Sequence, residues 1–198
     1  MSLDKICLVV LVGITAFFSS CQGNNDTVDQ GEAALSVIHN RKSVRNYIKE
    51  RPIEKQDVET LLKAAMAAPS GKDVRPWEFI VIDDRETLDR MADALPTAKM
   101  LTEAPMAIVV CGDTVRSSYW YLDCSAAAQN ILLAAEALEL GAVWTASYPY
   151  RDRMQVVIDN TNMPPHTLPL VVIPIGYPKG PQKAKEKFDS SRIHLNEW

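Results

Sequence analysis

Arg41-Lys42-Ser43-Val44-Arg45 is the stretch from which the rest of the chain is interpreted. Three of its five side chains are cationic, and Ser43 adds a hydroxyl. Guanidinium groups bind phosphate oxygens through paired hydrogen bonds, and a hydroxyl satisfies a remaining acceptor. The pentapeptide therefore predicts contact with a phosphate-bearing small molecule. Taken alone, it is better interpreted as a solvated basic turn, because runs of charge usually face water.

Length and composition bound the possibilities. The chain has 198 residues, of which 47% are hydrophobic, which suits one domain with a sizeable core. Its net charge of −4 argues against a nucleic-acid-binding surface, since such surfaces are strongly basic. The cysteines and histidines show no zinc-ligand spacing, so no metal site is expected.

The N-terminal segment has the pattern of an export signal. Lys5 precedes an apolar run at 6–18, which is too short to span a bilayer and fits the hydrophobic region of a signal peptide. Ser19-Ser20 before Cys21 resembles a bacterial lipobox. We expect a signal peptide at 1–21, a polar tether at 22–30 and one domain at 31–198. The protein would be exported and anchored to a membrane through lipidated Cys21. An ordinary secretory signal, or an N-terminal helix of a cytoplasmic protein, is the alternative.

Hydrophobic periodicity predicts alternating helices and strands after this segment. We expect helices at 33–40, 58–66, 98–103, 119–140 and 151–158, and a further helix that starts after Asp83 or Asp84 and runs through 91–94. Asp57 would cap the helix at 58–66, and Gly141 would end the helix at 119–140. Strands are expected at 78–82, 106–111, 142–146 and 170–175. The helix at 119–140 is so apolar that it must be buried, in a core or against another subunit. Residues 178–198 have no apolar helical face and are expected to form an extended arm. Cys111 and Cys124 are expected to be buried free thiols.

Four blocks, in order, carry a resemblance to a known family. The segment 41–45 resembles the Arg-Arg-Ser-x-Arg opening of the nitroreductase family of FMN-dependent NAD(P)H oxidoreductases. Ala68-Pro69-Ser70 with Pro76-Trp77 resembles its second block, 141–145 its third, and 175–178 its end. The resemblance covers 35–198. It implies an α+β fold with a mixed, mainly antiparallel sheet flanked by helices. It also implies an intertwined homodimer with FMN in two clefts at the subunit interface.

The resemblance also assigns FMN contacts. These fall on Arg41, Lys42, Ser43, Arg45, Pro69, Ser70, Asp73, Ala146, Ser147, Lys187 and Arg192. Arg41 and Ser43 would bind the phosphate, completed by Lys187 or Arg192, with Lys42 near the ribityl-phosphate end. Arg45 would approach N1 and O2 of the ring, where a cation stabilises the negative charge that reduction brings. Pro69 and Ser70 would come from the other subunit.

The remaining assignments concern the ring and the loop at 68–77. Backbone groups around Ala146 and Ser147 would face the ring near N5. Lys99 is a weaker candidate for the ring edge, with a solvated lysine as the alternative. Asp73 stands where the family commonly has Asn, and Arg75 where it has Gln. Asp73 would therefore bring a carboxylate towards the flavin unless Arg75 or Lys72 neutralises it.

The implied activity is hydride transfer from NAD(P)H to a nitroaromatic, quinone or related small-molecule acceptor, by a ping-pong cycle. Since the flavin carries the chemistry, no catalytic acid or base is assigned. One alternative keeps FMN for another chemistry such as dehalogenation, although the short segment at 113–118 leaves little chain for an acceptor lid. The other is a lipid-anchored flavin-binding or interaction module without turnover, because NAD(P)H is scarce outside the cytoplasm.

Overall fold

The computed structural model describes residues 29–198. The predicted signal peptide, Cys21 and the tether up to residue 28 lie outside this range. The helices are α1 (Gln30–Asn40), α2 (Lys55–Met66), α3 (Arg85–Ala94), α4 (Trp120–Ala137) and α5 (Arg151–Thr161), with short 3-10 turns η1 (Gly71–Asp73), η2 (Lys99–Thr102) and η3 (Ser190–Arg192). The strands are β1 (Trp77–Ile82), β2 (Met106–Asp113), β3 (Gly141–Ala142), β4 (Thr145–Ala146) and β5 (Thr167–Gly176). Asp29 caps α1, which takes in Gln30 from the end of the expected tether.

The sheet has the order β1-β2-β5-β3, with β4 also paired to β5. All of these pairings are antiparallel. A parallel bridge joins Ser43 to Ala142, so the sheet is mixed only at this point. The predicted α+β class with a mainly antiparallel sheet is therefore confirmed.

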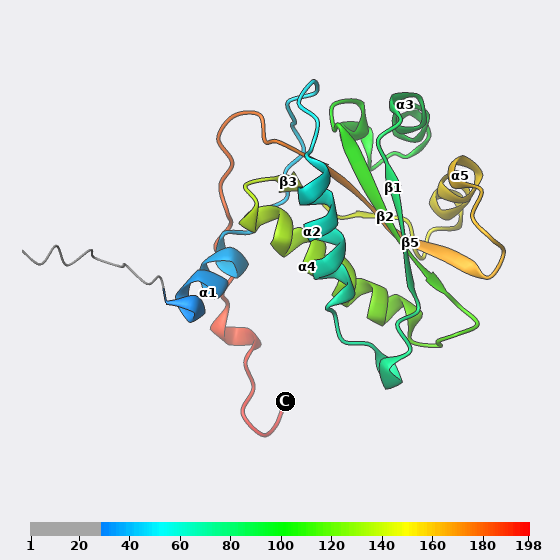
Figure 1. Cartoon of the computed structure of the whole chain (residues 1–198). Helices are drawn as coiled ribbons and strands as arrows, with labels where there is room; N and C mark the ends of the chain where they lie inside the picture. The colour runs from blue at the N-terminus through cyan, green and yellow to red at the C-terminus, as the bar shows by residue number, and fades with distance from the viewer. Residues whose placement is uncertain (1–28) are drawn as a thin grey trace, which may run out of the picture.

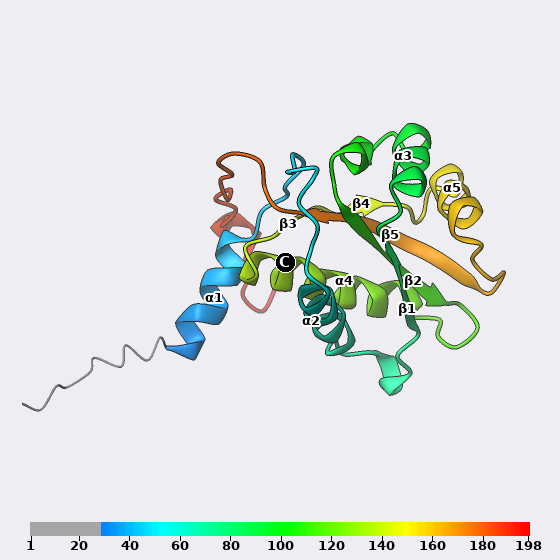
Figure 2. The ribbon, with the colours of Figure 1, turned by 45° about the horizontal axis from the view of Figure 1, so that its top comes forward.

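Helices cover both faces of the sheet (Figure 1, Figure 2). α2 and α4 pack on one face, around Leu61, Ile131 and Ile173. α3, η2 and α5 cover the other face, around Met91, Leu101 and Val157. Because both faces are covered, β2 and β5 are buried along nearly their whole length, as their uninterrupted apolar sequences indicate. Within residues 29–198, no helix is both long and apolar enough to cross a membrane.

Several of the predicted helix boundaries are wrong. α1 begins three residues earlier than expected, and α5 ends three residues later. α2 begins at Lys55, two residues before its expected cap, so Glu54 is the residue that precedes the helix and Asp57 lies inside its first turn. α4 ends before Gly141, since Glu139 takes the left-handed conformation (φ 57°) that ends the helix. By contrast, Asp84 caps α3 as expected, with its carboxylate accepting the Thr87 N–H at 2.8 Å.

The predicted strand at 142–146 is interrupted. β3 pairs Ala142 with Ile175, and β4 pairs Thr145 with Val172, while Val143 and Trp144 between them leave the ladder. The sequence shows only a continuous apolar run there, so local pattern does not reveal the break. The break matters because both of these residues line a cavity.

The predicted buried thiols are confirmed. Cys111 and Cys124 are both buried and free. The Cys124 thiol donates to the Cys111 carbonyl at 3.3 Å. Burial raises the pKa of each thiol to about 12, so both stay protonated at physiological pH. Neither has the character of a reactive cysteine.

Candidate cofactor-binding site

The segment at 41–47 is held against the end of the sheet by two buried anchors. Val44 and Tyr47 are each 1% exposed. The Val44 N–H donates to the Ala142 carbonyl at 3.0 Å. With Val44 turned inward, Ser43 and Arg45 on either side of it are exposed. An apolar residue in the middle of the basic stretch is therefore what turns its polar side chains outward.

The Tyr47 hydroxyl reinforces this anchor. It lies 2.6 Å from the Val44 carbonyl oxygen and 3.1 Å from the Pro174 carbonyl oxygen. Burial raises the pKa of Tyr47, although the nearby Arg45 charge opposes the shift, so the hydroxyl remains a donor at physiological pH. It thus links the basic segment to β5.

Replacing Tyr47 by Phe is expected to lower the free energy of unfolding by about 1 kcal/mol, because the buried carbonyls lose their shared donor. Urea unfolding followed by circular dichroism measures this change. Tyr119→Phe is the control, since Tyr119 is half exposed. Equal stability of the Tyr47 variant and the parent would show that the hydroxyl does not secure the segment.

The outward side chains line a cavity of about 230 Å³. Its walls are Arg41, Lys42, Ser43, Arg45, Lys183, Lys185 and Lys187. Four of the predicted contacts from the first block, together with Lys187, therefore come together. Arg192 does not line it; its side chain is 84% exposed and pairs with Asp189 at 3.1 Å. We call this the basic cavity.

The C-terminal arm contributes two cavity residues that sequence reasoning missed. After β5 the arm returns towards α1 (Figure 1), which brings Lys183 and Lys185 to the basic cavity beside Lys187. Their spacing in the sequence could have predicted them, since the side chains of Lys183, Lys185 and Lys187 lie at i, i+2 and i+4 and so share one face of an extended segment. What the sequence did not show is which part of the chain this face would meet.

The charges of the basic cavity are poorly compensated by acids. Lys42 pairs with Glu136 at 2.7 Å. The other five cationic side chains form no ion pair with any residue in 29–198. Several unpaired cations around one concave site create a local positive potential although the whole chain is acidic. This is the electrostatic environment that a phosphate group requires.

A second cavity, of about 430 Å³, adjoins the first and shares Arg45 with it. It is lined by Arg45, Thr97, Val143, Trp144, Thr145, Ala146 and Arg153. We call it the wide cavity. The interrupted segment between β3 and β4 supplies Val143, Trp144, Thr145 and Ala146 to its lining, and the role of Ala146 towards the flavin ring stays a prediction. Ser147 is buried, and its N–H already donates to the Leu170 carbonyl at 3.0 Å.

Arg153 and Thr97 were not anticipated as site residues. Arg153 comes from the first turn of α5, and Thr97 from the segment between α3 and η2. No motif or spacing in the sequence links either of them to Arg45. Only the packing of these elements around β4 and β5 places them in one cavity.

Pro69, Ser70 and Asp73 line neither cavity. They lie in the loop between α2 and β1, whose η1 turn projects from the molecule (Figure 2). Asp73 and Arg75 form a two-point ion pair at 2.7 and 2.8 Å, so Arg75 does neutralise the Asp73 carboxylate. The assignment of this loop to the flavin of another subunit stays a prediction.

The loop is preorganised despite its strained backbone. Lys72, Asp73 and Arg75 all have positive φ angles, between 52° and 55°. Such conformations persist where the surroundings determine them. Here the carboxylate of buried Asp123, on α4, accepts the Gly71 N–H at 2.8 Å.

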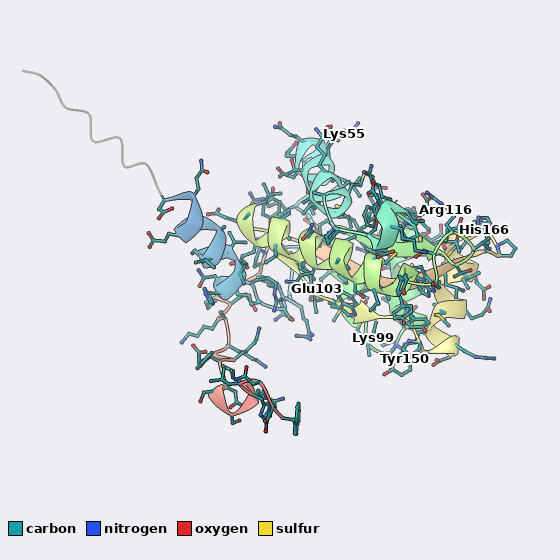
Figure 3. All side chains as sticks on the ribbon, turned by 90° about the horizontal axis from the view of Figure 1, so that it is seen from below. Lys55, Lys99, Glu103, Arg116, Tyr150 and His166 are labelled. Carbon is teal, nitrogen blue, oxygen red and sulfur yellow. The ribbon has the colours of Figure 1, made fainter. Side chains whose placement is uncertain are left out.

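Lys99 lines neither cavity, and its assignment to the ring edge stays a prediction. Its ammonium donates to the carbonyls of Ala92 and Asp93, at 2.8 and 2.9 Å. These carbonyls belong to the last turn of α3, so Lys99 satisfies that helix end. Lys99 is an exposed residue that is nevertheless tied to this helix by two hydrogen bonds. The residue is labelled in Figure 3.

Known proteins resemble this chain in sequence over most of its length. The model of the nitroreductase family matches residues 38–98 and 92–177. A protein of Methanothermobacter thermautotrophicus, provisionally named an NADH dehydrogenase/NAD(P)H nitroreductase, is 42% identical over 167 residues, covering 83% of this chain and 87% of that protein.

Solved structures extend the likeness to three dimensions. A Bacteroides thetaiotaomicron protein with the same provisional name is 61% identical, with a TM-score of 0.83 over 84% of this chain and 98% of the other. An FMN-dependent nitroreductase of Clostridium difficile is 31% identical, with a TM-score of 0.79 over 83% of this chain and 99% of the other.

Proposed function

Because this chain belongs to the nitroreductase family and is an oxidoreductase, we propose that it uses FMN to carry two electrons from NADH or NADPH to a small acceptor. Nitroaromatics, quinones and related compounds are the proposed acceptors, reduced in a ping-pong cycle. The observation that carries the proposal is the pair of adjoining cavities that share Arg45. One is small and basic, and the other is larger and is lined by both apolar and polar residues.

The residues present fit the two ends of FMN. A phosphate needs cationic and hydroxyl donors, which Arg41, Ser43 and Lys187 supply in the basic cavity. A flat aromatic ring needs a largely apolar surface, to which the partly exposed Trp144 and Ala146 contribute in the wide cavity. The donors and the surface therefore suit a phosphate-bearing aromatic cofactor.

When bound, FMN supplies the redox chemistry by accepting hydride from NAD(P)H and passing it to the acceptor. The protein supplies binding and electrostatics. Arg41, Ser43 and Lys187 would hold the phosphate. Arg45, at the junction of the cavities, would place a fixed cation beside the ring and favour negative charge there. The chain needs no nucleophile or general base for this role.

We also propose that the protein works as a homodimer. Several apolar side chains of α1, α4 and the arm are more than half exposed in the single chain: Leu35, Ile38, Leu122, Phe188, Ile193, Leu195 and Trp198. Exposed apolar surface of this extent is typical of an interface. A second subunit would cover it and bring the loop with Ser70 and Asp73 to the other subunit's flavin. Anchoring through lipidated Cys21 remains part of the proposal.

The test is an absorbance spectrum of the purified protein before and after NADH or NADPH is added under argon. Flavin bands that bleach, and return when a quinone or nitroaromatic is added, are the expected result. Flavin bands that neither donor bleaches would favour the binding-module alternative. A protein that takes up no FMN, even after incubation with excess, would contradict the proposal.

A further inference from the structure

Arg153 is the part of the wide cavity that the proposed function does not use. Its side chain lines this cavity together with Arg45. Its Nη1 makes a long hydrogen bond, 3.4 Å, to the Ala146 carbonyl. Its Nε is buried and has no hydrogen-bond partner among residues 29–198. A buried donor without a partner is costly, so the native environment is expected to supply an acceptor.

The surroundings hold the guanidinium in place without neutralising it. It stacks over the ring of Tyr150, 3.9 Å from the ring centroid. Tyr150 directly precedes α5 and is labelled in Figure 3. Stacking uses the face of the guanidinium and leaves the donors on its edge available. No acidic residue in 29–198 forms an ion pair with Arg153, and adjacent Asp152 is exposed.

Arg85 is the second arginine with a buried Nε that lacks a partner among residues 29–198, and it differs from Arg153 in its other contacts. The rest of its guanidinium donates to the Leu101 and Ala104 carbonyls and pairs with Asp89. Arg85 therefore has a structural role that accounts for its burial. Arg153 has only the weak contact to Ala146, and it lies in a cavity wall.

We propose that Arg153 is a specificity residue that binds a carboxylate or phosphate on the small molecule that enters the wide cavity. An anion of this kind would accept from the edge of the guanidinium, satisfying the buried Nε. The half-exposed ring of Tyr150 beside it would contact the uncharged part of the same molecule. The protein would thus prefer anionic partners over neutral ones of the same size.

The anion bound by Arg153 would belong either to an acidic aromatic acceptor or to the 2′-phosphate of the electron donor. This proposal rests on the proposed function, because it presumes that a reaction partner enters next to the cofactor. Its test is nevertheless a binding measurement that needs no turnover. Failure to reduce any acceptor would therefore contradict the proposed function and leave the binding result interpretable.

Isothermal titration calorimetry on protein saturated with FMN, which would fill the basic cavity, provides the test. One arm compares 4-nitrobenzoate with neutral 4-nitrobenzamide, and the other compares adenosine 2′-phosphate with adenosine. The variants are Arg153→Gln, which removes the charge, and Arg153→Lys, which keeps it. Arg151→Gln is the matched control, because Arg151 is an exposed cation in the same turn of α5.

We expect the protein to prefer the anionic member of at least one pair. Arg153→Gln should reduce that preference by about tenfold or more, the scale of a lost charge-assisted hydrogen bond. Arg153→Lys should retain part of it, and Arg151→Gln nearly all of it. An equal loss of the preference for the anion in the Arg151 and Arg153 variants would overturn the assignment. It would show that any positive charge near the cavity has the same effect. A parent protein with no preference in either arm would overturn the assignment as well.

Discussion

Replacing Arg41 by Ala is expected to weaken FMN binding by about 10- to 150-fold, or about 1.5–3 kcal/mol. Arg41 lines the basic cavity and forms no ion pair with any residue in 29–198, so its charge is available to a phosphate. The charge-assisted hydrogen bonds that it would make are among the stronger polar interactions in proteins. Titration of FMN-free protein with FMN, followed by flavin fluorescence, measures the affinity.

Two comparisons make this result specific. Riboflavin lacks the phosphate, so its affinity should hardly change in the Arg41 variant. Arg192→Ala is the control for the loss of a cation, because Arg192 lies outside the basic cavity and pairs with Asp189. If the Arg41 variant binds FMN as tightly as the parent, or loses riboflavin to the same extent, the phosphate does not lie in this cavity.

Replacing Gly141 by Ala is expected to lower the free energy of unfolding by about 1–3 kcal/mol, the usual cost of overpacking. A Cβ at this position would lie 2.6 Å from Val44 Cγ1 and 2.8 Å from Val44 Cβ. Both distances are well inside van der Waals contact, so the segment at 41–45 would have to move away from β3. Because that segment forms a wall of both cavities, weaker FMN binding should accompany the loss of stability.

A second substitution tests whether contact with Val44 causes the loss of stability. Val44→Ala removes both Cγ atoms that would meet the new methyl group, so it should recover part of the stability when combined with Gly141→Ala. Urea unfolding of the two single variants and the double variant gives the coupling energy. Additive losses would show that the Val44 Cγ atoms are not the source of the strain, although the Val44 Cβ would still lie 2.8 Å from the new methyl group. A variant of Gly141 as stable as the parent would show that the close approach is not a constraint.

Gly141 also shows what the neighbouring sequence can and cannot predict about a single residue. A glycine after a long apolar helix is most simply interpreted as its cap. In the structure Glu139 takes the left-handed conformation, and Gly141 is needed for the close approach of Val44. Helix existence depends on periodicity within the segment, and the five long helices were therefore expected correctly. The reason for a particular glycine depends on what packs against it, which local pattern does not contain.

The amino-acid sequence alone was sufficient for the fold class, through the resemblance of four ordered motifs to a known family. It was also sufficient for the basic segment, because that segment is a motif of adjacent residues. The composition of the cavities was decided only by tertiary structure. Lys183 and Lys185 join Arg41 because the arm returns after β5, and Arg153 joins Arg45 because α5 packs beside β5. A cavity is formed by side chains from segments far apart in the chain, and their convergence is set by packing.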